Sequence, residues 1–259
     1  MGTNTISQQL ETLFDKWCKQ LEQNSDGANF TKDGVMFQNG IEPEETERQW
    51  LASPKRVLFL LKDQYQEGNP KWDEDIRYWF KDMPSDSEET AKKKASVRST
   101  LQGPMGKFFI KNLAYIFWGL NKVNKDAAWL LDEVKANFEE VREFFLSQPW
   151  AIVECKKVPG DGKLADKVLR HHVNNYGKLL EEEIKILNPN MIVCTHKIIY
   201  SSVLKMYPAN ELTIVEGHNN VWYHSKSDTL IFCSYHPSAW NVNVYEGVLN
   251  HYRAFLKTK

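Results

Sequence analysis

A histidine follows the last strand-like run of the chain, which reads Leu230-Ile231-Phe232-Cys233-Ser234-Tyr235-His236-Pro237-Ser238-Ala239-Trp240. Pro237 cannot continue a central strand and restricts the residue before it, so we expect His236 where the strand stops. In an open α/β sheet, ligands bind in the crevice beyond the strand ends. His236 is therefore a candidate site residue, and the alternative is a buried histidine at a capped strand end.

A carboxylate, Asp63, follows the first strand-like run in the same way. Residues 56–61 read R-V-L-F-L-L, which suits a strand buried on both faces of a parallel sheet. Asp63 and His236 would then face one crevice from two strands. An acid and a histidine placed so can orient a water and stabilise an oxyanion, as in hydrolysis through a cationic sugar transition state. Alternatively, Asp63 is a helix N-cap or a turn residue.

Strands and helices alternate along the chain. We expect strands at residues 56–61, 150–155, 191–195 and 229–234. Helical spacing of apolar residues predicts helices at residues 5–22, 44–51, 107–120, 127–146, 165–187, 197–206 and 244–255. The alternation predicts a three-layer α/β/α sandwich around a central, mainly parallel four-stranded sheet. We expect one domain over residues 1–259, with an N-terminal helical extension over 1–52 and an insertion over 67–102.

The composition is that of an ordinary globular protein. The 259 residues are 42% hydrophobic and 26% charged, with a formal net charge of −1, so binding of nucleic acid would depend on a local basic patch. Candidate patches are Lys92-Lys93-Lys94 with Arg98, and Lys156-Lys157 with Lys163. There is no signal-peptide core and no apolar run of membrane-spanning length, so we expect a cytoplasmic protein, a monomer, with no membrane contact.

Several common site types have no signature here. The four cysteines, Cys18, Cys155, Cys194 and Cys233, are widely spaced and lack a C-x-x-C pair, which favours structural thiols over a metal site or disulfides. The sequence has no G-x-G-x-x-G, no G-x-x-x-x-G-K-[ST] and no G-x-S-x-G. The strand ends must therefore be interpreted individually.

Four segments, in order, resemble the uracil-DNA glycosylase superfamily. Residues 57–66 align without gaps on that family's V-V-I-L-G-Q-D-P-Y-H and keep its aspartate and tyrosine, while residues 236–240 are similar to its H-P-S-P-L. Residues 153–160 resemble the N-V-V-K-C-R-P-P-G segment of the thermostable, iron-sulfur branch, and residues 179–195 resemble that branch's helix and third strand. Residues 103–106 are similar to a glycine-rich turn. The resemblance spans residues 55–257.

The resemblance implies a glycosylase that extrudes a base from DNA and hydrolyses its N-glycosidic bond. Asp63 would position the water and stabilise the sugar cation, and His236 would donate a hydrogen bond to the base O2. Tyr65 would shape the pocket floor, with Gln64 and Glu154 beside it as base-binding residues. The residues expected to contact DNA are Ser238, Trp240 as a wedge in the gap left by the base, Lys157 and Lys62. For Trp240 the alternative is packing under the last helix.

Departures from the family pattern bear on the substrate. Leu61, Lys62, Gln64 and Gln66 replace residues of G-Q-D-P-Y-H, and Glu154 or Ala151 stands where an asparagine reads uracil. An acidic acceptor there would suit a base with an exocyclic amine. Only Cys155 matches a cluster cysteine, so we expect a divergent member without an iron-sulfur cluster, and no metal or cofactor.

Three functions stay open on this reasoning. The first is an active DNA glycosylase with an altered base preference. The second is a nucleobase-binding or DNA-binding module on the same fold that has lost efficient hydrolysis, which the altered first motif favours. The third is a protein-interaction module, favoured by the near-neutral charge and the aromatic residues of segment 67–102.

Overall fold

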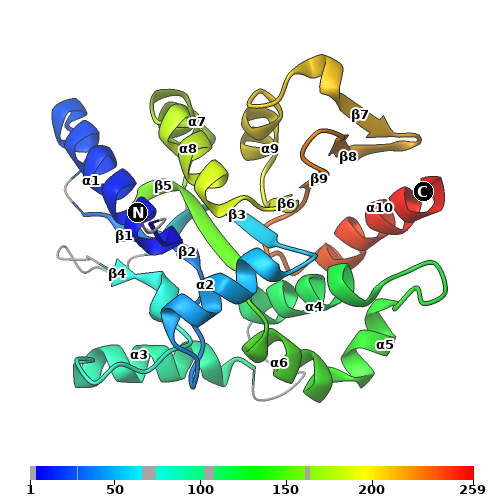
Figure 1. Cartoon of the computed structure of the whole chain (residues 1–259), viewed down its shortest axis with the longest axis horizontal. Coiled ribbons are helices and arrows are strands. Elements are labelled where there is room, and N and C mark those ends of the chain that lie inside the picture. Colours follow the sequence, from blue (N-terminus) through cyan, green and yellow to red (C-terminus); the bar gives the residue numbers. More distant parts are fainter. Residues whose placement is uncertain (1–3, 28, 66–73, 102–107, 161–163) are drawn as a thin grey trace.

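The computed structural model describes residues 4–27, 29–65, 74–101, 108–160 and 164–259. A seven-stranded sheet with the order β2-β5-β3-β6-β9-β8-β7 runs through the molecule (Figure 1). Its central strands, β5 (Ala151–Gly160), β3 (Val57–Tyr65), β6 (Met191–Cys194) and β9 (Thr229–Cys233), pair in parallel. These are the four strands expected from the sequence, so the parallel core of the fold is confirmed.

The expected strand number was too low, because antiparallel strands extend the sheet at both edges. β2 (Gly34–Val35) pairs with β5, while β8 (His218–His224) pairs with β9 and with β7 (Leu212–Val215). A separate parallel pair joins β1 (Thr31–Lys32) to β4 (Glu74–Asp75). β1 and β2 lie between the helices expected at residues 5–22 and 44–51, where the sequence predicted no strand.

Helices cover both faces of the sheet (Figure 1). One face packs against α1 (Ile6–Asn24), α7 (Asp166–Asn175), α8 (Gly177–Leu187) and α9 (Lys197–Leu204). The other packs against α4 (Phe108–Lys122), α6 (Phe138–Ser147) and α10 (Val244–Thr258). Side chains alternate along β3, so Leu58 and Leu60 join the first core while Phe59 and Leu61 join the second. The predicted three-layer arrangement is confirmed.

Two helices predicted as continuous are interrupted in the structure. Residues 127–146 contain α5 (Leu131–Ala136) and α6, separated at Asn137, whose ψ of 30° lies outside the helical range. Residues 165–187 contain α7 and α8, separated at Tyr176 with a φ of −112°. The remaining elements are α2 (Pro43–Ala52), α3 (Glu88–Ser99) and the short 3₁₀ helices η1 (Ile76–Tyr78) and η2 (Ala209–Glu211).

The helix α1 begins at a capping box, in which Thr5 and Gln8 exchange side-chain to backbone hydrogen bonds. Its apolar stripe, which includes Leu10, Phe14 and Trp17, is buried against the sheet. Full burial stabilises the fold by about 1.5–3 kcal/mol for a leucine or phenylalanine side chain. Helix α1 is thus an integral part of one helical layer.

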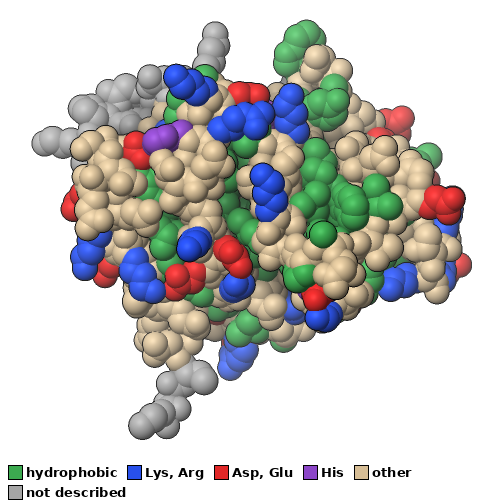
Figure 2. All heavy atoms as spheres, turned by 90° about the horizontal axis from the view of Figure 1, so that it is seen from above, with side chains coloured by type: hydrophobic (Ala, Val, Ile, Leu, Met, Phe, Trp, Pro, Cys, Tyr) green, Lys and Arg blue, Asp and Glu red, His purple; other side chains and the backbone are tan. Residues whose placement is uncertain are grey.

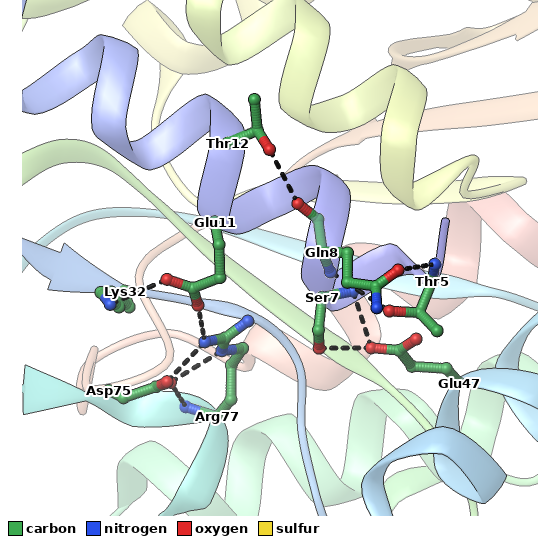
Figure 3. Close-up of polar contacts among 9 residues, drawn as sticks. All are labelled: Thr5, Ser7, Gln8, Glu11, Thr12, Lys32, Glu47, Asp75 and Arg77. Atoms are coloured by element: carbon green, nitrogen blue, oxygen red, sulfur yellow. Dashed lines mark hydrogen bonds and ion pairs between the residues drawn. The ribbon is translucent and has the colours of Figure 1, made fainter. Parts of the chain in front are cut away.

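Polar contacts join α1 to the described part of segment 67–102 (Figure 3). The Arg77 guanidinium, 4% exposed, donates to Glu11 and to Asp75 at 2.5 Å each, and Lys32 donates to Glu11 at 2.8 Å. Glu47 of α2 accepts a hydrogen bond from the backbone N–H of Ser7 at 2.8 Å. These bonds hold α1 against β1, β4 and α2.

Candidate active site

Asp63 and the loop after β9 lie at the same edge of the sheet, where parallel strands have their carboxyl ends. Strand β6 separates β3 from β9, so the two strands are about 10 Å apart at about 4.8 Å per neighbour. Asp63 shares the strand face of Phe59 and Leu61, which the α4 layer covers. The imidazole of His236 stacks on Phe109 of α4, with ring centroids 5.7 Å apart and an interplanar angle of 22°. Both side chains therefore lie on the α4 side of this edge.

The Asp63 carboxylate is held in a narrow space between β3 and β5. Its side chain is 8% exposed and its Oδ2 lies 3.5 Å from the Lys156 ammonium. A Cβ at Gly160 would overlap Asp63 Oδ2 and come within 3.3 Å of Lys156 Nζ. The register of β3 on β5 also shifts between Asp63 and Tyr65. A glycine at position 160 is thus what leaves room for the carboxylate.

The loop that carries His236 is pinned by three hydrogen bonds. The backbone N–H of Ala239 donates to the carbonyl of His236 at 2.8 Å, closing a turn through Pro237. The side chain of Asn112, on α4, donates to the carbonyl of Pro237 at 2.6 Å. The backbone N–H of Ser238 donates to His236 Nδ1 at 3.2 Å. The imidazole is therefore oriented by its own loop and by α4.

The environment of His236 favours the neutral ring. Burial, followed by the charges of Lys62 and His196, lowers the pKa of His236 to about 4. Because Nδ1 accepts a hydrogen bond from Ser238, the proton of the neutral ring sits on Nε2. His236 can therefore donate from Nε2 without carrying a positive charge.

The sequence analysis missed His196, which lies close enough to lower the pKa of His236. His196 follows β6 and caps α9, with Nδ1 accepting from the Ile198 N–H at 3.3 Å and Nε2 3.4 Å from Asp166. Its place after Thr195, directly beyond the third predicted strand, was the available signal. Lys62 lies within electrostatic range of both histidines. This edge of the sheet therefore carries the positive charge of Lys62 as well as Asp63 and His236.

Of the expected base-binding residues, Glu154 and Gln64 have described side chains, and Glu154 is the more deeply buried. It is 2% exposed and pairs in register with Leu61 of β3, next to the pair formed by Asp63 and Lys156. Gln64 is partly buried in β3. Tyr65 ends β3, but its side chain lies outside the described residues, as do the glycine-rich segment 103–106 and Lys163.

Two lysines expected at nucleic-acid contacts have other partners, so those expectations were wrong. Lys157 is fully buried and binds Asp33 at 2.5 Å and Glu183 at 2.8 Å, out of reach of a nucleic acid. Lys94 of the first basic patch is 5% exposed and binds Asp86 at 2.6 Å. Strand alternation explains Lys157, because it puts this side chain on the α1 face, over the rings of Phe14 and Trp17.

The loop around His236 exposes two aromatic side chains. Trp240 is 81% exposed and Tyr235 is 60% exposed, so the packing alternative for Trp240 does not hold. Ser238, between them, is also exposed. Large exposed aromatic rings beside a partly buried histidine are typical of a binding surface.

With this geometry established, one comparison decides the family. A sequence model of the uracil DNA glycosylase superfamily matches residues 83–258. The chain belongs to the uracil DNA glycosylase superfamily. No curated protein matches it significantly. The superfamily match contains Glu154, His196 and His236, whereas Asp63 precedes it. The likeness of the first motif to this superfamily therefore rests on residues 57–66 themselves.

The described residues also limit which other groups this superfamily member could hold. Among them, no cluster of three or more His, Cys, Asp or Glu side chains could hold a metal ion, and no helix is long and apolar enough to cross a membrane. Cys155 and Cys194 are free thiols buried in the core on the α1 face. Burial raises the pKa of both buried thiols well above its usual value, which is typical of structural cysteines.

Proposed function

We propose that this protein is a DNA glycosylase, which hydrolyses the N-glycosidic bond of a damaged or modified base turned out of DNA. Membership of the uracil DNA glycosylase superfamily supports the reaction class. The observation that carries the proposal is the neutral His236, with its proton on Nε2, at the same sheet edge as Asp63. The base must leave the stack because its sugar carbon is otherwise inaccessible, at a cost of a few kcal/mol.

The two groups divide the chemistry between the sugar and the base. As the bond between C1′ and the base nitrogen breaks, its electron pair leaves with the base and positive charge develops on the sugar. The Asp63 carboxylate stabilises that charge and orients the water whose oxygen bonds to C1′, and the proton that this water loses neutralises the released base anion. His236 donates a hydrogen bond to the base oxygen that becomes negative. A neutral imidazole is a much weaker acid than an imidazolium. It therefore stabilises the developing anion through a hydrogen bond and keeps its proton.

The neighbouring residues supply DNA contacts in this proposal. Ser238 and the adjacent backbone hold a phosphate, and Trp240 stacks in the gap left by the base. Lys62 contributes a positive charge beside the two histidines. Gln64 and Glu154 line the base pocket from β3 and β5, and the part of Tyr65 in the pocket floor stays a prediction.

The test is release of free base from single-stranded and duplex oligonucleotides that carry uracil, hypoxanthine, xanthine or hydroxymethylated cytosine. We expect the wild type to release at least one of these bases, and His236→Ala to release it about 10²–10³-fold more slowly, the usual effect of losing one donor to a developing anion. Equal rates for both proteins would remove His236 from the mechanism.

One observation favours a second function, that of a DNA-binding or nucleobase-binding module with little hydrolysis. Lys156 Nζ lies 3.5 Å from Asp63 Oδ2, and this ion pair offsets the charge with which Asp63 would stabilise a sugar cation. This function predicts salt-dependent binding of oligonucleotides without formation of abasic sites. Any turnover that His236→Ala abolishes would contradict it.

A further inference from the structure

Glu154 sits beside Asp63 on the face of the sheet that α4 covers. Residues paired in register on parallel strands point to the same face, and Leu61 pairs with Glu154 as Asp63 pairs with Lys156. The backbone N–H of Glu154 donates to Asp33 Oδ2 at 2.7 Å, which fixes this part of β5. Its carboxyl group is therefore a rigid part of the proposed base pocket.

The cations near Glu154 are already engaged by other groups. Lys157 points to the opposite face, where it binds Asp33 and Glu183. Lys156 pairs with Asp63 and donates to the carbonyl of Val158. Glu154 Oε2 is buried and, among the described residues, has no hydrogen-bond partner. A buried carboxylate oxygen without a partner disfavours the ionised form of the group.

Electrostatics agrees with this geometry. Burial, and then the negative charges of Asp33 and Asp63, raise the pKa of Glu154 well above its ordinary value, while Lys157 and Lys156 oppose this shift. This shift favours the neutral carboxylic acid over the carboxylate. The acid offers an O–H donor and a C=O acceptor side by side.

We propose that Glu154 determines base specificity as a neutral carboxylic acid, donating a hydrogen bond to an acceptor on the base and accepting one from the adjacent N–H. This inference rests on the proposed glycosylase function. The matching ligand is a base edge on which an acceptor adjoins a donor, as in the lactam of uracil or hypoxanthine and the amidine of cytosine. An ionised carboxylate would repel that acceptor, so the acid form replaces the purely accepting role expected from the sequence.

The first measurement is the ionisation of Glu154 in the full-length protein. The ¹³Cδ signals of labelled glutamate are followed from pH 4 to pH 9, with Glu154→Gln assigning the Glu154 signal. We expect that signal to keep the shift of a protonated acid through pH 7. A signal that titrates near pH 4.5 would overturn the proposal.

The second measurement separates Glu154 from the rest of the site. Single-turnover release of uracil, hypoxanthine and cytosine from oligonucleotides is compared at pH 6 and pH 9 for wild type, Glu154→Gln and Glu154→Leu. We expect wild type to release base more slowly at pH 9 than at pH 6, because an ionised Glu154 repels the acceptor on the base. The amide keeps one donor and one acceptor at both pH values, so Glu154→Gln should stay within tenfold of wild type at pH 6 and show no such decline at pH 9. Glu154→Leu should lose more than 100-fold at both pH values. The base that wild type releases fastest distinguishes a lactam from an amidine substrate.

Two controls complete the test. Glu182→Gln on the surface of α8 should leave release unchanged, and N3-methyluracil, which has no N–H to donate, should be released at least tenfold more slowly than uracil. If the wild type releases base and Glu154→Leu matches it, this inference fails while the glycosylase function stands. If the wild type releases no base from any oligonucleotide, the glycosylase function itself fails and the inference falls with it, whatever the carbon signal shows.

Discussion

At the scale of single residues, the proposed catalysis depends on the protonation of His236. The backbone N–H of Ser238 occupies Nδ1, and burial opposes a positive charge on the ring. The sequence predicted the position of His236 but not its hydrogen bond or its burial. Pro237 after an apolar run predicted where His236 stands, but nothing in the sequence predicted that Phe109 and Asn112 of α4 would hold its loop.

His236 should titrate near pH 4 in the folded protein, below its ordinary value of about 6.5. Since the unfolded chain binds this proton more readily, the stability contributed by His236 is present above pH 6.5 and is lost as the pH falls towards 4. Nuclear magnetic resonance of the imidazole carbons measures the pKa directly, with His236→Gln as the assignment control. A pKa of 6 or above would contradict the neutral-donor role.

Gly160→Ala should damage the site, because the added Cβ would meet the Asp63 carboxylate. We expect a loss of about 1–3 kcal/mol in the free energy of unfolding, typical of overpacking, together with reduced base release. Gly247→Ala is the matched control, since no atom lies within 4 Å of its Cβ and the residue lies inside α10. That substitution should be neutral or slightly stabilising. Denaturant unfolding measures the free energy of unfolding of both variants. Equal losses for Gly160→Ala and Gly247→Ala would refute the steric argument.

At the scale of elements, a buried ion cluster joins β5 to α8 and to the segment between β1 and β2. Lys157 contacts Asp33 and Glu183, and the Asp33 carboxylate also accepts the Glu154 backbone N–H. Burial alone would lower the pKa of Lys157, but the two carboxylates outweigh it and raise that pKa. The cluster therefore supports the strand from which Glu154 and Lys156 project.

Lys157→Met should destabilise the fold by about 3–5 kcal/mol, because it leaves buried carboxylates without their cation. Lys16→Met is the control, since its ion pair with Glu182 is exposed and exposed pairs contribute about 0–1 kcal/mol. Thermal or denaturant unfolding compares the two variants. A loss below 1 kcal/mol for Lys157→Met would show that the cluster stabilises little.

The helices and strands that the sequence predicted best are those in which the apolar residues follow a single pattern from end to end. The four parallel strands were readable because their apolar runs are buried on both faces. The β7–β8 hairpin was missed because β8 is short of apolar residues, although Gly217, with a φ of 74°, marks its turn. The breaks at Asn137 and Tyr176 were missed because the apolar spacing continues across them, and tertiary packing decides where each helix ends.

At the scale of the whole molecule, the net charge of −1 provides no general attraction to DNA. On the face that Figure 2 shows, Lys and Arg side chains are interspersed with Asp and Glu, and hydrophobic side chains reach the surface between them. DNA binding in this account therefore depends on the sheet edge around Lys62 and the His236 loop. A single cytoplasmic domain acting as a monomer stays a prediction.

Lys62→Met should weaken binding of an oligonucleotide and reduce the slope of log affinity against log salt by about 1, the effect of losing one phosphate contact. Lys16→Met on α1 serves again as the control and should leave the slope unchanged. Fluorescence anisotropy at 50–200 mM salt provides both values. An unchanged slope for Lys62→Met would place the DNA elsewhere.

The most direct test of the central claim is single-turnover base release by wild type, Asp63→Asn, His236→Ala and the double variant on the oligonucleotide that wild type cleaves best. If Asp63 and His236 act on one glycosidic bond, each single variant loses about 10²–10⁴-fold and the double variant falls to background. Release at the wild-type rate by either single variant would contradict a shared site at this sheet edge.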